Sequence, residues 1–221
     1  MKKLIRNTLG PDFLSNCSHE LHDWRRLRSR NRKKSLWLHL KLMQNGFCCY
    51  CESVAVQGNG HVEHFFYKGK KNGVAPYKDK TFEWSNLFGC CGTPGHSHCG
   101  HFKDKEGREG PGDYNPYDLI KPDEDDPSEY FHFIRSGHIR VNSDLSIDDE
   151  RRAKETIRVL NLGVGSLNSA REVQIGIVKR EVEALLDLTE NLSDIKNELA
   201  RIKSETKNSV FQTAVISALD L

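Results

Sequence analysis

The sequence contains no long hydrophobic run. Its longest apolar stretches fall far short of the roughly 20 consecutive apolar residues that cross a bilayer, and 29% of its 221 residues are charged. The N-terminal residues also lack the apolar stretch of about 7 to 15 residues found in secretory signals, because Gly10 and Pro11 interrupt the chain first. These absences exclude a transmembrane protein and predict a cytoplasmic one with no membrane partner.

Internal repeats and low-complexity tracts are also absent, and the chain is long enough to bury a sizeable core. Glycine and proline are missing from Ser18 to Asn45, a segment whose leucines and tryptophans predict one or two helices. Residues 47–115, in contrast, contain 11 of the 17 glycines. That composition favours a small irregular or β-rich unit over long helices.

The second half opens with a connector rich in proline and aspartate, residues 111–130. Two short apolar arms around Ser136-Gly137 predict a hairpin over residues 130–141. Ser146 predicts a helix start and residues 160–163 a helix end. From residue 166 to about residue 207, Leu, Ile and Val recur at three- and four-residue intervals without proline, which predicts a long helical stretch.

These patterns predict an α+β protein with three regions. Residues 1–46 form a basic N-terminal helical segment, residues 47–115 a compact unit that contains most of the cysteines, and residues 116–221 an acidic connector, a hairpin and a C-terminal helical region.

The formal net charge is only +2, but positive and negative charges are unevenly distributed between the two halves of the chain. Residues 1–110 contain 19 Lys and Arg against 10 Asp and Glu, and residues 111–221 contain 14 against 21. A dense basic run draws in phosphate polyanions by counterion release; the alternative is a solvated helix face that only aids solubility. The candidates for nucleic-acid contacts in the basic run are Arg25, Arg26, Arg28, Arg30, Arg32, Lys33 and Lys34.

Six of the seven cysteines lie in two tight groups, which in a reducing compartment favours a metal site over disulfides. Cys48 and Cys51 form a C-x-x-C knuckle, and Cys91 with Cys99 can supply a second pair about forty residues later. Four thiolates suit tetrahedral zinc and leave no open coordination position, so the zinc would be structural. The second pair is more widely spaced than a standard knuckle. The residues that could replace one ligand are Cys90, His96 and His98.

Between the two pairs lie His61-Val62-Glu63-His64-Phe65 and Trp84-Ser85-Asn86-Leu87, and His101 follows Cys99. This order resembles the HNH nucleases. The likeness is more specific to the HNH subunit of Septu-type antiphage systems, including those attached to retrons, and it covers about residues 20–175. The segments that carry it are Gln44-x-x-Phe47-Cys48-x-Tyr50-Cys51-Glu52, Val62-Glu63-His64-Phe65, Trp84-x-Asn86-Leu87, Cys99-Gly100-x-x-Lys103, Asp125-Asp126-Pro127 and Thr156-Ile157-x-x-Leu160-Asn161-Leu162.

The resemblance implies a zinc-stabilised ββα-metal core flanked by N- and C-terminal helical regions, and metal-dependent cleavage of DNA or of an RNA such as tRNA. It implies that His64 is the general base, that Glu63 binds a catalytic Mg²⁺ or Mn²⁺, and that Asn86 orients the loop. Hydrolysis of a phosphodiester needs a base to generate hydroxide and a cation to stabilise the developing charge. His61 could serve as the base by residue type, but the family places its base directly after the acidic residue. His61 shares a strand face with Glu63 if the segment is extended.

Two positions depart from the family pattern. Gly100 stands where a His or Asn usually follows the last cysteine, so the expected second ligand of the catalytic cation is His101, with His98 or His96 as alternatives. Phe66-Tyr67-Lys68 stands where Arg-Pro-Lys is common. Lys68 and Lys103 are the further candidates for nucleic-acid contacts.

The resemblance also implies partners: an ABC-type ATPase and, in retron versions, a reverse transcriptase with its RNA-DNA product. The helical stretch from Ser166 to Leu221 is the candidate docking surface for the ATPase, and packing on its own domain is the alternative. A rival function is a non-catalytic zinc module that binds nucleic acid or a protein partner.

Overall fold

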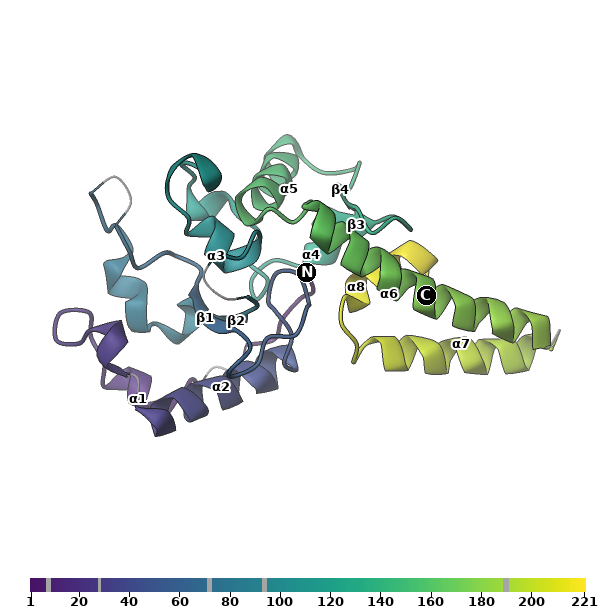
Figure 1. Ribbon diagram of the computed structural model, residues 1–221, viewed down its shortest axis with the longest axis horizontal. Coiled ribbons are helices and arrows are strands. Elements are labelled where there is room, and N and C mark those ends of the chain that lie inside the picture. The colour runs from purple at the N-terminus through teal and green to yellow at the C-terminus, as the bar shows by residue number, and fades with distance from the viewer. Residues whose placement is uncertain (7–8, 28, 71–72, 93–94, 189–190) are drawn as a thin grey trace.

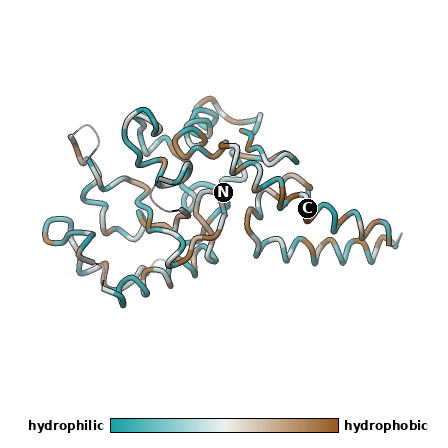
Figure 2. Tube along the Cα trace, in the orientation of Figure 1, coloured by the Kyte–Doolittle hydropathy of each residue, from teal (hydrophilic) through white to brown (hydrophobic). Residues whose placement is uncertain are grey.

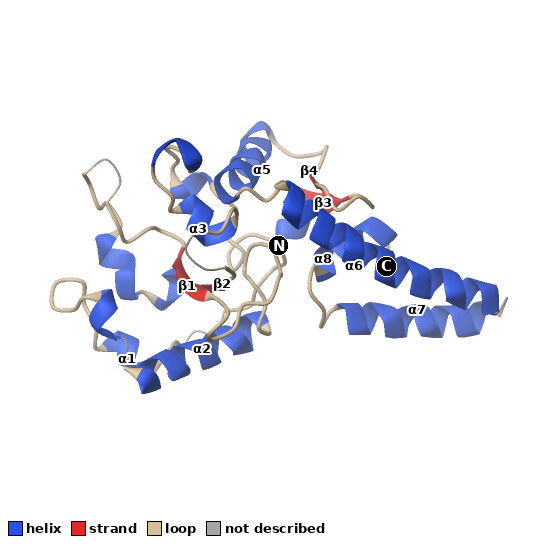
Figure 3. Cartoon of the chain, in the orientation of Figure 1, coloured by secondary structure: helices blue, strands red, loops and turns tan. Residues whose placement is uncertain are grey.

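The computed structural model describes residues 1–6, 9–27, 29–70, 73–92, 95–188 and 191–221, except for the side chains of residues 26 and 27. It is a mixed α and β structure with two small two-stranded sheets, as the sequence predicted at the level of fold class. Figures 1 and 3 show one lobe built from the N-terminal and central segments and a long helical hairpin that extends from it. Among the described residues, none of the helices has the length and apolarity needed to cross a membrane.

The N-terminal segment is helical in part. It contains α1 (Asp12–Ser15), a 3-10 helix (Trp24–Leu27) and α2 (Arg30–Gln44). Helix α2 begins after Ser29, whose side chain accepts a hydrogen bond from the Arg32 amide, and ends at Asn45 in a left-handed conformation. A serine that accepts from the first turn caps the start of a helix, and a residue in the left-handed conformation ends one. The predicted end of the helix at Asn45-Gly46 is therefore confirmed.

The first sheet pairs β1 (His61–His64) with β2 (Leu87–Cys90) in antiparallel register, with His61 opposite Cys90 and His64 opposite Leu87. Gln44 at the end of α2 extends the hydrogen bonding of β2. Its Nε2 donates to the Gly89 carbonyl at 2.7 Å, and the Gly89 amide donates to its Oε1 at 2.7 Å. Gln44 therefore fixes α2 against the sheet.

The two faces of this sheet contact different parts of the protein. Because side chains alternate along a strand, Leu87 joins a cluster with Leu36, Trp37 and Leu40 of α2. Phe88 lies on the opposite face, in the larger core that also contains the clustered cysteines. The sheet thus lies between most of α2 and the cysteines, and only near its end does α2 contact both clusters, through Met43.

A short helix, α3 (Cys99–Lys103), follows β2 and completes the order β1, β2, α3. The long connection from β1 to β2 contains two 3-10 helices, Lys78–Phe82 and Trp84–Asn86. Further on, the short helix α4 (Pro127–Tyr130) leads into the predicted hairpin, which is confirmed as β3 (Phe131–Phe133) paired with β4 (Ile139–Val141).

The C-terminal region consists of α5 (Ile147–Leu160), α6 (Gly165–Leu188), α7 (Leu192–Thr206) and α8 (Gln212–Leu219). The predicted start of α5 is confirmed, since Ser146 accepts a hydrogen bond from the Asp149 amide, and so is its end at Asn161. The stretch expected from residue 166 to about 207 is two helices, because Asn191 accepts from the Ser193 amide and starts α7. Helices α6 and α7 form the extended hairpin, and both alternate polar and apolar residues (Figures 1 and 2).

Residues of the C-terminal region share the core of the cysteine-containing lobe. Ile202 of α7 and Ala214 of α8 belong to the same hydrophobic cluster as the buried cysteines. The Thr213 amide of α8 donates to Glu52 beside the first knuckle at 3.0 Å, and Asn161 donates to the Ser97 carbonyl at 2.8 Å. An ion pair joins the connector to α5, since Arg152 Nη2 lies 2.8 Å from Asp125 Oδ2.

Candidate functional site

Four cysteines from distant segments meet in the core. The sulfur atoms of Cys48, Cys51, Cys91 and Cys99 all lie within 4.8 Å of one another, and all four side chains are buried. The Sγ atoms of Cys51 and Cys91 are 3.5 Å apart, and those of Cys48 and Cys99 are 3.9 Å apart. This set matches the tetrahedral four-thiolate sites that hold zinc. The predicted grouping is confirmed, and the cluster is suited to hold a zinc ion.

The three alternative ligands lie next to this cluster. Cys90 groups with Cys48 and Cys49, and His96 and His98 group with Cys91. His98 Nδ1 lies 3.1 Å from the Cys99 sulfur. The Gly100 amide donates to the Cys90 sulfur at 3.4 Å. Cys17 lies apart from these cysteines, half-buried against α1, where its thiol contacts the Phe13 carbonyl.

Burial affects two of the clustered thiols in the same way. It raises the pKa of the Cys51 thiol and that of the Cys99 thiol well above their usual values. Without a cation both side chains remain protonated at neutral pH, whereas zinc binds thiolates. Metal binding would therefore release protons and supply the charge that lets buried thiolates persist.

Glu63 lies on the face of β1 that points toward α3. Lys103 Nζ is 3.0 Å from its Oε1, and Tyr50 donates to the same oxygen at 3.3 Å. His61 Nε2 is 3.4 Å from Oε2. Burial alone would raise the pKa of Glu63, but the charge of Lys103 and the contact with His61 outweigh it and lower that pKa to about 2. Glu63 is therefore an ionised carboxylate in the core.

Lys103 differs from its expected role. Its side chain is fully buried, and besides Glu63 its ammonium contacts Asp104 at 2.8 Å and the His64 carbonyl at 3.0 Å. A lysine in this position cannot reach a nucleic-acid phosphate. It neutralises Glu63 and ties α3 to β1, which corrects the expectation of a nucleic-acid contact.

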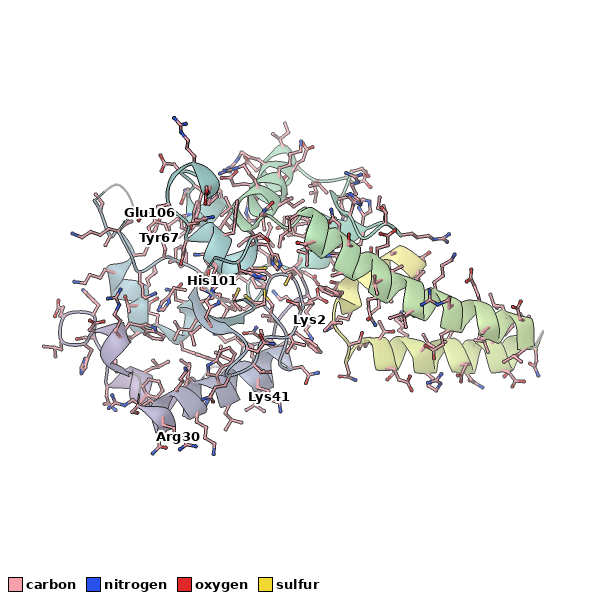
Figure 4. The ribbon with its side chains drawn as sticks, in the orientation of Figure 1. Lys2, Arg30, Lys41, Tyr67, His101 and Glu106 are labelled. Atoms are coloured by element: carbon pink, nitrogen blue, oxygen red, sulfur yellow. The ribbon has the colours of Figure 1, made fainter. Side chains whose placement is uncertain are left out.

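His101 lies on α3 (Figure 4). Its ring stands against that of His61, with the ring centroids 3.9 Å apart. His61 Nδ1 and His101 Nε2 are buried and make no hydrogen bond of ordinary geometry among the described residues, although the Gly92 backbone lies near both rings. The Glu63 carboxylate outweighs the effect of burial and raises the pKa of His61, whereas burial and then His61 lower the pKa of His101. Glu63, His61 and His101 thus form one group beside the zinc-type cluster.

Gly100 makes this group possible. A Cβ atom at residue 100 would overlap the Glu63 carboxylate and the imidazole of His61. Position 100, where the resemblance led us to expect a His or Asn, therefore has no room for a side chain, and the imidazole that reaches the group comes from the next residue, His101.

His64 lies on the other face of β1, under the N-terminal segment. Its side chain is buried, and the Trp24 ring meets it edge-on with centroids 4.5 Å apart. His64 Nε2 lies 3.1 Å from the Thr81 carbonyl, which only accepts, so that nitrogen carries the proton. Its Nδ1 faces Lys68 Nζ at 3.5 Å. Burial and then the Lys68 charge lower the pKa of His64 to about 3.

Asn86 fixes the loop that connects β1 to β2. Its Oδ1 accepts from the Phe66 amide at 2.7 Å, and its Nδ2 donates to the carbonyls of Phe66 at 3.0 Å and Lys80 at 2.9 Å. The side chain is buried, and its amide oxygen and both of its amide hydrogens take part in hydrogen bonds. Asn86 thereby fixes the residues directly after His64.

The basic residues of α2 are exposed. Arg30, Arg32, Lys33 and Lys34 occupy the first two turns, and Figure 4 shows Arg30 and Lys41 at opposite ends of this helix. Arg25 is exposed in the preceding 3-10 helix. Arg28 and the side chain of Arg26 lie outside the described residues.

Sequence patterns gave no sign that Trp24 lies against His64, because that contact joins segments forty residues apart.

The chain was compared with protein-family models and with curated proteins, and neither comparison yields a match.

Proposed function

We propose that this protein is a metal-dependent HNH endonuclease that hydrolyses phosphodiester bonds of DNA or RNA. The observation that supports it best is the order β1, β2, α3 fastened by a four-cysteine cluster, with His64 at the end of β1 and Asn86 fixing the loop that follows. The resemblance carried by the sequence motifs implies a ββα order of this kind, which is why this observation supports the proposal. Zinc at the cysteines would have a structural role, because four protein ligands leave no position for substrate.

The catalytic cation would be bound by Glu63, His61 and His101. The ionised carboxylate and the two imidazoles are donors of the right chemistry. The rings would have to turn to bind one cation, because among the described residues these three do not bring their donor atoms together as a metal-binding group, and His61 presents Nε2, not Nδ1, to Glu63. Such a mixed set suits a transition-metal cation such as Mn²⁺ better than Mg²⁺, which prefers oxygen ligands. The cation would stabilise the charge that develops on the phosphate and on the leaving oxygen.

His64 is the proposed general base, and its Nδ1 is the nitrogen that would take the proton. In the arrangement described above, Lys68 faces Nδ1 and Trp24 covers the ring. Catalysis by His64 therefore requires Trp24 and Lys68 to move, which would also strengthen the base by raising its pKa. His61 is the second candidate, since it lies on the same face as Glu63 and is only partly buried.

The exposed cations of α2 would hold the nucleic-acid backbone without reading sequence, because phosphate contacts position a nucleic acid and base contacts specify it. The resemblance to Septu-type nucleases suggests action in antiphage defence beside an ABC-type ATPase and, in retron versions, a reverse transcriptase with its RNA-DNA product. The α6–α7 hairpin is the proposed contact for the ATPase. Val173, Ile177 and Leu188 are exposed apolar residues along it.

The test is cleavage of plasmid DNA, single-stranded DNA and total tRNA by the protein, alone and with the ATPase, in Mn²⁺, in Mg²⁺ and in neither. The proposal expects cutting that requires the added cation. Absence of cutting in every condition, with one zinc per chain and no second metal bound, would favour the rival function of a non-catalytic binding module.

A further inference from the structure

A cavity of about 510 Å³ lies between α1, α2 and the first residues of β1. Its apolar walls include three aromatic side chains, Phe13, Trp24 and Trp37. Trp37 is buried, whereas Phe13 and Trp24 are half-buried. Cavities of this volume, lined mainly by aromatic and aliphatic groups, are typical of sites for small organic molecules and flat rings.

Two cations border the same cavity. Arg32 and Lys33, on the first turn of α2, line it and are otherwise exposed to solvent. The Arg32 guanidinium carbon lies 6.0 Å from the centre of the Phe13 ring. Aromatic faces next to positive charges are the combination with which proteins hold unpaired nucleotides, since the base stacks and the phosphate is neutralised.

The cavity also adjoins the proposed catalytic strand. His61 and Val62 of β1 line it, and Trp24 contacts both the cavity and the His64 ring. A nucleotide held here would lie beside His61 and against Trp24, the residue that contacts the His64 ring.

We propose that this cavity binds an unpaired nucleobase, with the adjoining phosphate on Arg32 and Lys33, so that the substrate is single-stranded DNA or RNA or a single-stranded loop. The proposal rests on the nuclease function in that it assigns the substrate class of the same site. Bases in a duplex are stacked and paired, and an enzyme reaches them only by extruding them. Duplex nucleic acid would therefore contact α2 without filling the cavity.

The test measures binding, not cleavage. A fluorescently labelled single strand of DNA, the same sequence as RNA, and each as a duplex are titrated with the zinc-containing protein, without added Mn²⁺ or Mg²⁺. We expect the wild-type protein to bind single strands more tightly than duplexes. Phe13→Ala should weaken single-strand binding about tenfold, within the usual range for loss of one stacking contact, and leave duplex binding unchanged. Tyr117→Ala, which removes an exposed aromatic ring outside the cavity, is the matched control.

The cations have their own control on the same helix. Arg32→Ala should weaken single-strand binding more than Lys41→Ala, although each removes one charge from α2. Because Phe13→Ala could impair folding, tryptophan emission of the wild type is measured as well, and a thymidine trinucleotide should quench it through Trp24 and Trp37. The inference is overturned if duplexes bind as tightly as single strands and Phe13→Ala affects neither, or if the trinucleotide leaves the emission unchanged.

These outcomes separate the inference from the proposed function. Cleavage together with binding that does not depend on Phe13 would overturn the cavity assignment and leave the nuclease intact. Single-strand binding that depends on Phe13, without cleavage under any condition, would support the cavity and count against the nuclease.

Discussion

Glu63 and His64 are neighbours on β1, and their side chains lie on opposite faces of the sheet. Glu63 contacts Lys103 and His61 on the side of α3, and His64 contacts Thr81 and Trp24 on the side of the N-terminal segment. A base and a cation ligand must act on one phosphate. In this arrangement a phosphate bound near Glu63 is out of reach of the His64 imidazole. Catalysis by His64 therefore requires the end of β1, or the Trp24 and Lys68 side chains that cover the ring, to move.

The covering of His64 predicts an unusual titration. Because burial and Lys68 lower its pKa to about 3, the imidazole should stay neutral down to roughly that pH in the folded protein. Unfolded chains bind this proton near pH 6.5, so His64 lowers stability as the pH falls below about 6.5, and the loss levels off near pH 3. Titration of the histidine ring signals by NMR measures the pKa directly.

The same titration tests the role of Trp24. Trp24→Ala opens the ring to water and should raise the pKa of His64 toward its usual value. Trp84→Ala is the control, since the Trp84 ring meets His39, and it should leave the pKa of His64 unchanged. An unchanged His64 pKa in Trp24→Ala would show that Trp24 does not cover it.

The cysteine cluster predicts dependence on zinc. Purified protein should contain about one zinc per chain, and Cys51→Ser should lose it together with several kcal/mol of stability, because metal binding and folding are coupled in such sites. Metal analysis and thermal unfolding measure both effects. Cys17→Ser, outside the cluster, should retain the zinc. Full zinc content in Cys51→Ser would mean that another side chain, such as Cys90, takes its place.

Gly100→Ala tests the fit between α3 and β1. The added methyl group would overlap the Glu63 carboxylate, so we expect a loss of about 1–3 kcal/mol in the free energy of unfolding, as is usual for overpacking. Gly163→Ala is the matched control, because a Cβ atom there meets nothing within 4 Å. Equal stability of the two variants in urea unfolding would contradict the described packing around Glu63.

The features that were predictable from the sequence are local ones. The cysteine spacing predicted the four-cysteine cluster, and Ser136-Gly137 predicted the hairpin. Ser146 and Asn161 predicted the ends of α5, and strand alternation placed His61 and Glu63 on one face. Each of these features is determined by residues close together in the sequence or, for the cysteines, by the ligand preference of zinc.

The features that were missed depend on distant contacts. Whether Lys103 is exposed or buried depends on how α3 packs on β1, which the local sequence does not determine. His64 is covered by Trp24, and no sequence pattern in the segment around Trp24 indicates that it packs on β1. The break between α6 and α7 was missed because the apolar spacing continues across it, while Asn191 is a single capping residue.

The most direct test of the account compares three histidine variants in the cleavage assay with Mn²⁺. His64→Ala should reduce the rate by at least about 100-fold, a typical effect of losing a general base, whereas His138→Ala, an exposed histidine in the β3–β4 turn, should cut like the wild type. His61→Ala should raise the Mn²⁺ concentration needed for cutting. Cutting that survives His64→Ala and is abolished by His61→Ala at every Mn²⁺ concentration would contradict the assignment of His64 and make His61 the base.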